Sequence, residues 1–221
     1  MKKLILCLLA VIMPLYAKGS MPDDLVIIQK PIIFDDERKA LTLQYMKQRY
    51  GMVQDEPTIE PKMVVVHWTV IPTFAKTFDA FNPPQLPATR EGIRAGGELN
   101  VSSQFVIDRD GTIYQLMPET IMARHTIGLN YTAIGIENIA DGDGLPMTDA
   151  QLDANSRLIR YLAGKYPIEY VLGHSEYYRF RDTDWWKETD DSYFTEKNDP
   201  DIAFMNRLRS TLSDLALTPL P

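Results

Sequence analysis

The sequence contains very little cysteine and histidine. Among its 221 residues there are one cysteine, Cys7, and three histidines. Cys7 lies in an N-terminal segment that we expect to be removed, so disulfides, cysteine nucleophiles and cysteine metal ligands are excluded from the remaining chain. The Gly-x-Ser-x-Gly motif of serine hydrolases and the His-Glu-x-x-His motif of many metallopeptidases are also absent. Any metal site must therefore be built from histidine, aspartate and glutamate.

Long apolar runs are missing except at the N-terminus, where residues 1–17 read MKKLILCLLAVIMPLYA. Lys2 and Lys3 precede an apolar stretch, and Ala17 offers a small residue at a cleavage position, which predicts a secretory signal peptide. The alternative is a membrane anchor, but the stretch is short for a span and Pro14 interrupts it. We expect an exported protein, periplasmic or secreted, with no stable membrane insertion after the signal is removed.

Basic residues are too few for a nucleic-acid-binding protein. The chain has 23 basic and 30 acidic residues and a formal net charge of −7. Removal of Lys2 and Lys3 with the signal leaves 21 basic residues and a charge of −9. Because phosphate binding needs a basic surface, nucleic acid is not expected as a partner.

The periodicity of apolar residues predicts an α/β fold. The expected strands are 63–66, 101–108, 112–116, 133–136 and 170–172, with a hairpin turn at 108–111, and the expected helices are 35–51, 73–81, 148–165 and 201–215. Strands interleaved with helices indicate a single domain with a central mixed β-sheet flanked by helices. We divide the chain into a signal peptide (1–17), an N-terminal extension with a helix (18–58) and the main domain (59–215).

The helix expected over residues 35–51 follows an acidic start and ends at Gly51. Its apolar residues recur at helical spacing, at Ala40, Leu43, Met46 and Tyr50, with Leu41 and Tyr45 widening the same side. These residues are expected to form its buried face.

Two of the three histidines follow buried strands directly. His67 comes directly after the strand 63–66, and His174 follows the strand 170–172. In α/β sheets, ligands bind at the carboxyl ends of strands. Each histidine taken alone could be an ordinary hydrogen-bonded residue, but the pair favours a metal site. Zinc hydrolases use three protein ligands and leave one position open for water.

Glu137 is a candidate general base because it emerges from the apolar strand 133–136. An apolar surrounding raises the pKa of a carboxyl group, which suits a base working near neutral pH. A solvated strand end is the alternative interpretation of the same residue.

Five stretches in the right order carry a family resemblance. They are VVVHWT (64–69), SSQFVIDRDGTIYQLMPE (102–119), ARHTIGLNYTAIGIEN (123–138), LGHSE (172–176) and EKNDPDIAF (196–204). Over about residues 60–208 the chain resembles the zinc-dependent N-acetylmuramoyl-L-alanine amidases, which share a fold with the peptidoglycan-recognition proteins and the phage lysozyme-amidases. The main domain is thus expected to be an amidase domain.

The resemblance implies one zinc ion per chain, held by His67, His174 and Asp199. It implies that Glu137 takes a proton from the attacking water and passes it to the leaving amine. Lys197 is implied to stabilise the oxyanion that forms on the scissile carbonyl. His125 matches an active-site histidine of the family that lies near the zinc without binding it.

The sequence departs from the family pattern at two positions. Asp201 replaces the usual glycine after Asp-Pro, which puts the orientation of Asp199 in question; the fallback ligands are Asp182, Asp184, Asp190 and Asp191. Arg124 replaces the usual tryptophan before His125, which would alter substrate contacts.

The segment between His174 and Asp199 is much longer than in compact relatives. The surplus, residues 177–195, contains Trp185, Trp186 and Tyr193. One hypothesis makes it a wall of the substrate groove, with aromatic rings against sugar or peptide; the other has the tryptophans fix the loop to the domain.

The predicted function is therefore hydrolysis of the amide between N-acetylmuramic acid and L-alanine in peptidoglycan or muropeptides, serving cell-wall turnover or recycling, by a protein that we expect to be a monomer. The alternatives are a peptidoglycan-binding module without catalysis and an exported toxin that degrades the cell wall. Relatives that lack the third ligand bind without cutting, so the presence of all three ligands favours the enzyme.

Overall fold

A computed structural model describes residues 25–221, except for the side chain of Glu91. The predicted signal peptide lies outside the described residues. The elements are β1 (Ile27–Gln29), α1 (Asp36–Tyr50), β2 (Met63–Trp68), α2 (Phe74–Phe81), α3 (Glu91–Arg94), β3 (Phe105–Ile107), β4 (Ile113–Gln115), β5 (Ala133–Asn138), α4 (Asp149–Lys165), β6 (Tyr170–Gly173), the 3-10 helix η1 (His174–Phe180) and α5 (Ile202–Thr211).

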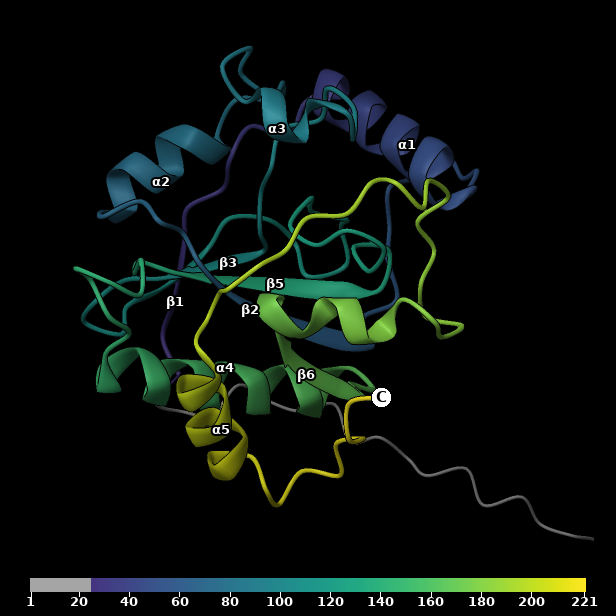
Figure 1. The fold of residues 1–221 in the computed structure, drawn as a ribbon. Helices are drawn as coiled ribbons and strands as arrows, with labels where there is room; N and C mark the ends of the chain where they lie inside the picture. Colours follow the sequence, from purple (N-terminus) through teal and green to yellow (C-terminus); the bar gives the residue numbers. More distant parts are fainter. Residues whose placement is uncertain (1–24) are drawn as a thin grey trace, which may run out of the picture.

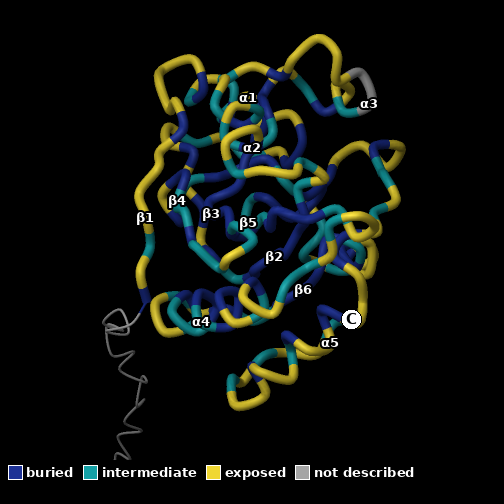
Figure 2. Tube along the Cα trace, turned by 90° about the vertical axis from the view of Figure 1, so that its left-hand side faces the viewer, coloured by how far each residue is buried: buried dark blue, intermediate teal, exposed yellow. Residues whose placement is uncertain are grey.

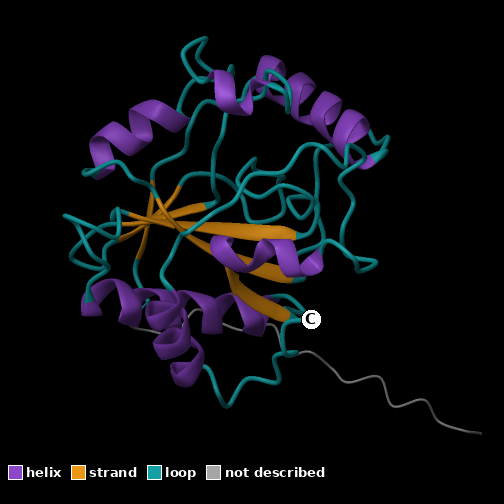
Figure 3. Ribbon diagram, viewed as in Figure 1, coloured by secondary structure: helices purple, strands orange, loops and turns teal. Residues whose placement is uncertain are grey.

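A six-stranded sheet crosses the middle of the molecule with helices on both sides (Figures 1 and 3). Its strand order is β1-β4-β3-β5-β2-β6. Only β3 and β4 pair antiparallel, through the predicted turn at 108–111, where Gly111 has a φ of 86°. All other neighbours are parallel. The predicted α/β fold with a central mixed sheet is confirmed.

The side chains of β2 alternate between two cores. Val64 and Val66 pack in the core that includes α4 and α5, whereas Met63 and Val65 pack against η1. Because successive strand residues point to opposite faces, His67 lies on the same face as Met63 and Val65. The alternation thus directs His67 away from α4 and α5.

The predicted helices α1, α2 and α4 are confirmed, and α4 begins with a capping box formed by Thr148 and Gln151. The last helix ends at Thr211, earlier than expected. Three short elements were not predicted, namely β1, α3 and η1. The edge strand β1 pairs with β4, and Figure 2 shows it largely exposed along the side of the molecule. The proposed division at residue 58 stays a prediction.

The predicted buried face of α1 is partly wrong. Ala40 is exposed and Leu43 is only half-buried, whereas Arg38 and Arg49 are buried. Both arginines have polar partners: Arg38 donates to three carbonyls at the end of α2, and Arg49 pairs with Glu188. Hydrophobic periodicity does not reveal such partners.

Within the described part of the chain, no helix has the length and apolar character needed to cross a membrane.

Candidate metal centre

The register of three parallel strands brings three predicted site residues side by side. His67 on β2 is the direct neighbour of Glu137 on β5. On the other side of β2, Val66 pairs with Gly173, so His174 follows at the level of His67. Parallel neighbours in register point to the same face and lie about 4.8 Å apart. The carboxyl edge of the sheet therefore presents Glu137, His67 and His174 in a row.

Asp199 reaches this row from the irregular segment before α5. The backbone N–H of Ser175 donates to the carbonyl of Asp199 at 2.6 Å, and the Ser175 hydroxyl donates to the carbonyl of Pro200 at 3.1 Å. Two hydrogen bonds thus tie the Asp199 segment to the residue after His174. Asp201 is the N-cap of α5 and accepts from the N–H of Phe204 at 2.8 Å. Asp201, which stands where the family usually has glycine, therefore caps a helix. The carboxylate of Asp199 still faces the two histidines.

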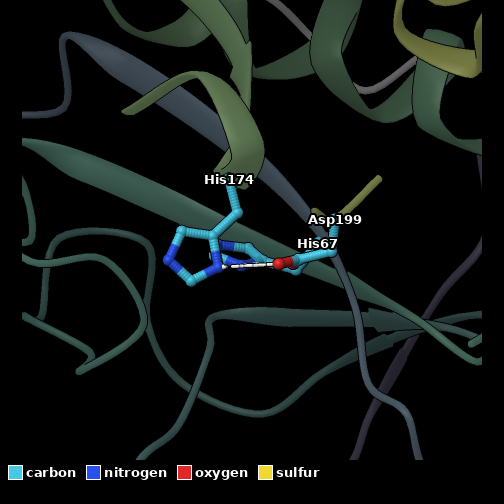
Figure 4. Close-up of side chains that lie close together, drawn as sticks. All are labelled: His67, His174 and Asp199. Atoms are coloured by element: carbon cyan, nitrogen blue, oxygen red, sulfur yellow. Dashed lines mark hydrogen bonds and ion pairs between the residues drawn. The ribbon is translucent and has the colours of Figure 1, made fainter. Parts of the chain in front are cut away.

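The carboxylate of Asp199 faces the Nδ1 atoms of both histidines (Figure 4). Its oxygens lie 3.4 Å from His67 Nδ1 and 3.2 Å from His174 Nδ1. All three residues are buried, and one ligand atom from each lies within 4.8 Å of the others. In a tetrahedral site with bonds of about 2.0–2.1 Å, ligand atoms are about 3.4 Å apart. The donor set and its spacing fit a zinc ion.

His125 lies behind His67 and fixes its ring. His67 Nε2 is 3.0 Å from His125 Nδ1, and His125 Nε2 is 3.3 Å from the carbonyl of Ala133. The carbonyl can only accept, so His125 carries its proton on Nε2 and accepts from His67 Nε2–H. The lone pair of His67 Nδ1 is then free for a metal. Zinc ligands commonly have their second nitrogen held in this way.

A glycine makes room for His125. A side chain at Gly135 would place its Cβ 2.8 Å from the His125 ring. Burial, with the neighbouring His67, holds the pKa of His125 well below its usual range. His125 is therefore a neutral hydrogen-bonding partner of His67 and lies outside the group of three ligands.

The electrostatics of the ligands favour a cation. Burial and the adjacent His67 lower the pKa of His174 to about 4, so its imidazole is neutral. Burial of Asp199 alone would raise its pKa, but the two histidines outweigh this effect and hold the pKa well below its usual range. A neutral imidazole at His174 and an ionised carboxylate at Asp199 are protonation states that metal binding requires.

Glu137 is a carboxylate of the opposite kind. Burial first, and then the charge of Asp199, raise the pKa of Glu137 well above its usual range. Its Oε2 atom is buried without a hydrogen-bond partner among the described residues. A buried oxygen without a partner is costly, and at a catalytic site it marks a position where water or substrate binds.

One cavity of about 370 Å³ joins all the predicted site residues. It is lined by the three ligands and by Glu137, Lys197 and His125. The fallback ligands lie outside the three-ligand group, and Asp190 instead pairs with Arg49 at 3.7 Å.

Arg124 lines the cavity, and its effect on substrate contacts stays a prediction. It is buried, and its guanidinium donates to the carbonyls of Gly97 and Leu99 and contacts the hydroxyl of Tyr193 at 3.1 Å. Its donors are therefore used to join two loops beside the cavity. Tyr45 of α1 also lines the cavity, and no motif in the sequence indicates it.

The two hypotheses for residues 177–195 apply to different side chains. Trp185 packs edge-on against Tyr170, and Trp186 lies against Tyr177 and Gly128. Neither tryptophan lines the cavity, so both fix the loop to the domain. Tyr193, by contrast, lines the cavity and forms part of its wall.

A histidine–histidine–carboxylate group at the carboxyl edge of an α/β sheet is typical of metal-dependent hydrolases. The family model of N-acetylmuramoyl-L-alanine amidase matches residues 57–201. The chain belongs to this family.

An endolysin of Enterobacteria phage K11 is 28% identical over 92 residues, which are 39% of this chain and 61% of the endolysin. The alignment thus spans about three fifths of that relative. Among solved structures, the N-acetylmuramoyl-L-alanine amidase endolysin LysCS of Clostridium intestinale is 21% identical with a TM-score of 0.51, over 85% of this chain and 95% of that one. The amidase LysC of the same organism has the same identity and TM-score, over 86% and 98%. These structures share the fold.

Proposed function

We propose that this protein is a zinc-dependent N-acetylmuramoyl-L-alanine amidase. It hydrolyses the amide between the lactyl group of N-acetylmuramic acid and L-alanine in peptidoglycan or muropeptides. The observation that carries the proposal is the position of Glu137, whose carboxylate has a buried oxygen without a hydrogen-bond partner, beside His67 in the same cavity as the three candidate ligands. Membership of the amidase family supports the choice of bond.

His67, His174 and Asp199 would hold the zinc ion. When bound, zinc polarises a carbonyl oxygen and lowers the pKa of an attacking water. The neutral imidazole of His174 and the ionised carboxylate of Asp199 need lose no proton to bind a metal near neutral pH. His125 keeps His67 in the correct tautomer.

Glu137 is the general base and then the general acid. It accepts a proton from water as the water attacks the carbonyl carbon, and it delivers that proton to the leaving amine of L-alanine. Its raised pKa brings it toward neutrality, where a carboxylate is a stronger base and its conjugate acid can still donate. The rate is therefore expected to fall as the pH drops through this pKa, because the protonated acid cannot accept a proton.

Lys197 lines the same cavity, two residues before Asp199. Its ammonium group would stabilise the negative charge that develops on the carbonyl oxygen. In a chain of net charge −7, Lys197 provides a local positive charge at the reaction centre.

The proposal also includes export to the periplasm or beyond, and a role in cell-wall turnover.

The test is an amidase assay on the full chain. New L-alanine amino termini are followed in purified peptidoglycan and in muropeptides, with chelator and with added zinc. Chelator-sensitive release, restored by zinc, is expected, together with binding of one zinc per chain and a higher melting temperature. A folded, zinc-loaded protein that binds muropeptides and releases nothing would make it a binding module.

A further inference from the structure

Val70 has a backbone conformation that its side chain disfavours. Its φ is 56°, the only positive value at a non-glycine position among the described residues. In this left-handed region a β-branched side chain crowds the backbone, so the conformation is strained. Strain of this kind persists where the surroundings impose it, and it clusters at functional sites.

Hydrogen bonds on both sides of residue 70 impose this left-handed backbone conformation, whatever the side chain there. The N–H of Thr69 donates to the carbonyl of Asn138 at 2.9 Å, and the N–H of Val70 donates to the carbonyl of Ala140 at 3.0 Å. On the other side, the Thr69 hydroxyl donates to the carbonyl of Ile71 at 2.8 Å and accepts from its N–H at 3.1 Å. The backbone is therefore fixed before and after Val70. Glycine would adopt this conformation without strain.

The valine side chain gains little from packing within the chain. It is 68% exposed, so the hydrophobic effect does not offset the strain. It lines the cavity together with His67, Trp68 and Thr69. Val70 is three residues beyond His67, which places it within about 11 Å of that ligand along the chain. A strained, exposed, apolar side chain at this position fits a contact with a bound molecule.

We propose that Val70 is a specificity-determining residue whose methyl groups contact a methyl group flanking the scissile amide. The inference rests on the proposed amidase function. In that substrate the amide is flanked by the methyl of the lactyl group on one side and the methyl of L-alanine on the other. The two methyl groups have the same chemistry. Substrate analogues that lack one or the other show which of them Val70 contacts.

The test compares wild type with Val70→Gly and Val70→Asn in the full chain. Both residues tolerate the left-handed conformation, so both variants are expected to melt no lower than wild type. On the natural muropeptide, kcat/KM is expected to fall about three- to tenfold, which is the usual effect of one lost methyl contact. The same three- to tenfold decrease is expected for the affinity for the muropeptide, measured by calorimetry in a Glu137→Gln background.

Two modified substrates locate the contact. One carries glycine in place of L-alanine, and the other carries a glycolyl group in place of lactyl. Wild type is expected to discriminate against the analogue that lacks the contacted methyl, and Val70→Gly is expected to lose that discrimination. Unchanged discrimination against both analogues in Val70→Gly would overturn the proposal.

Val53→Gly is the matched control. Val53 is 80% exposed, lies outside the cavity lining and has no positive φ. Glycine there is expected to lower the melting temperature by about 2–4 °C, through the entropy of the unfolded chain, and to leave kcat/KM unchanged. A similar loss of melting temperature in Val70→Gly would show that the valine is not strained and would contradict the inference.

The outcomes separate this inference from the proposed function. A wild-type chain that binds muropeptides but cuts none would refute the amidase, and the affinity ratios would still decide the role of Val70. A chain that binds no muropeptide would contradict both.

Discussion

The two halves of the cavity are built in different ways. Glu137, His67 and His174 lie on neighbouring strands, and their alignment follows from backbone pairing of β5, β2 and β6. Lys197 and Asp199 lie on an irregular segment that has no such ladder. The first half is positioned by register, and the second depends on side-chain contacts.

Several of those contacts come from far away in the chain. Arg49 of α1 pairs with the buried Glu188 at 2.8 Å and stacks on Tyr193 at 4.3 Å. The hydroxyl of Tyr177 donates to the carbonyl of Thr195 at 2.6 Å. Arg49 lies outside the span of the family model, residues 57–201. The long loop and the N-terminal extension therefore support each other.

The largest expected effect comes from Glu137→Gln in the strand-built half. Activity should fall about 10²- to 10⁴-fold, because the general base is lost. Zinc binding should be retained, since Glu137 is outside the ligand group. Turnover and zinc content measured on the same sample check this. Asp184→Asn, which alters an exposed carboxylate of the loop, is the control and should be neutral; retained turnover in Glu137→Gln would refute its role.

The next effect comes from the loop-built half. Arg49→Ala leaves Glu188, whose side chain is fully buried, without its partner, and should cost about 3–5 kcal/mol of unfolding free energy. Zinc affinity should fall as well, because the segment leading to Asp199 loses its support. Urea denaturation and chelator competition measure the two quantities. The pair Arg49→Met with Glu188→Leu should recover most of the stability; an unchanged midpoint in Arg49→Ala would show that α1 does not support the loop.

Acid should destabilise the metal-free protein through the histidines. His174 has a pKa of about 4 in the folded state, lowered by burial, and burial also lowers that of His125. Near pH 6.5 and below, the unfolded chain binds protons that the folded site does not, so stability falls as the pH drops from about 6.5 to about 4. Each histidine should contribute about 1.4 kcal/mol of unfolding free energy per pH unit, and Glu137, whose folded-state pKa is raised, contributes with the opposite sign and offsets one of them. The check is the unfolding free energy of chelator-treated protein, measured between about pH 4 and pH 6.5. An unfolding free energy that does not change with pH would argue against neutral, buried histidines.

A smaller effect is expected from His125→Phe. The aromatic ring keeps the contact with Gly135 but removes the acceptor for His67 Nε2–H. Zinc affinity should fall about 10- to 100-fold, as for other partners of metal ligands. Competition with a chelating dye measures it. An unchanged affinity would mean that Thr126, whose hydroxyl is 3.4 Å from His67 Nε2, suffices to hold the ring.

Much of the strand-built half could be predicted from the sequence. The run Met63–Val66 identifies a buried strand, and the position of His67 after it identifies the sheet edge. The burial of Arg38 and Arg49 could not be predicted, because it depends on partners far away in the sequence, namely the end of α2 and Glu188. The positive φ of Val70 was equally hidden, since its sequence gives no turn signal and the conformation is imposed by Ala140 and Ile71.

The most direct test of the account is a crystal structure of the zinc-loaded full chain with anomalous diffraction data at the zinc edge. The account predicts one ion bound by Nδ1 of His67, Nδ1 of His174 and a carboxylate oxygen of Asp199, at about 2.0–2.2 Å from each. It also predicts that His67 Nε2 keeps its hydrogen bond to His125. An ion bound elsewhere, or one held through His67 Nε2, would contradict it.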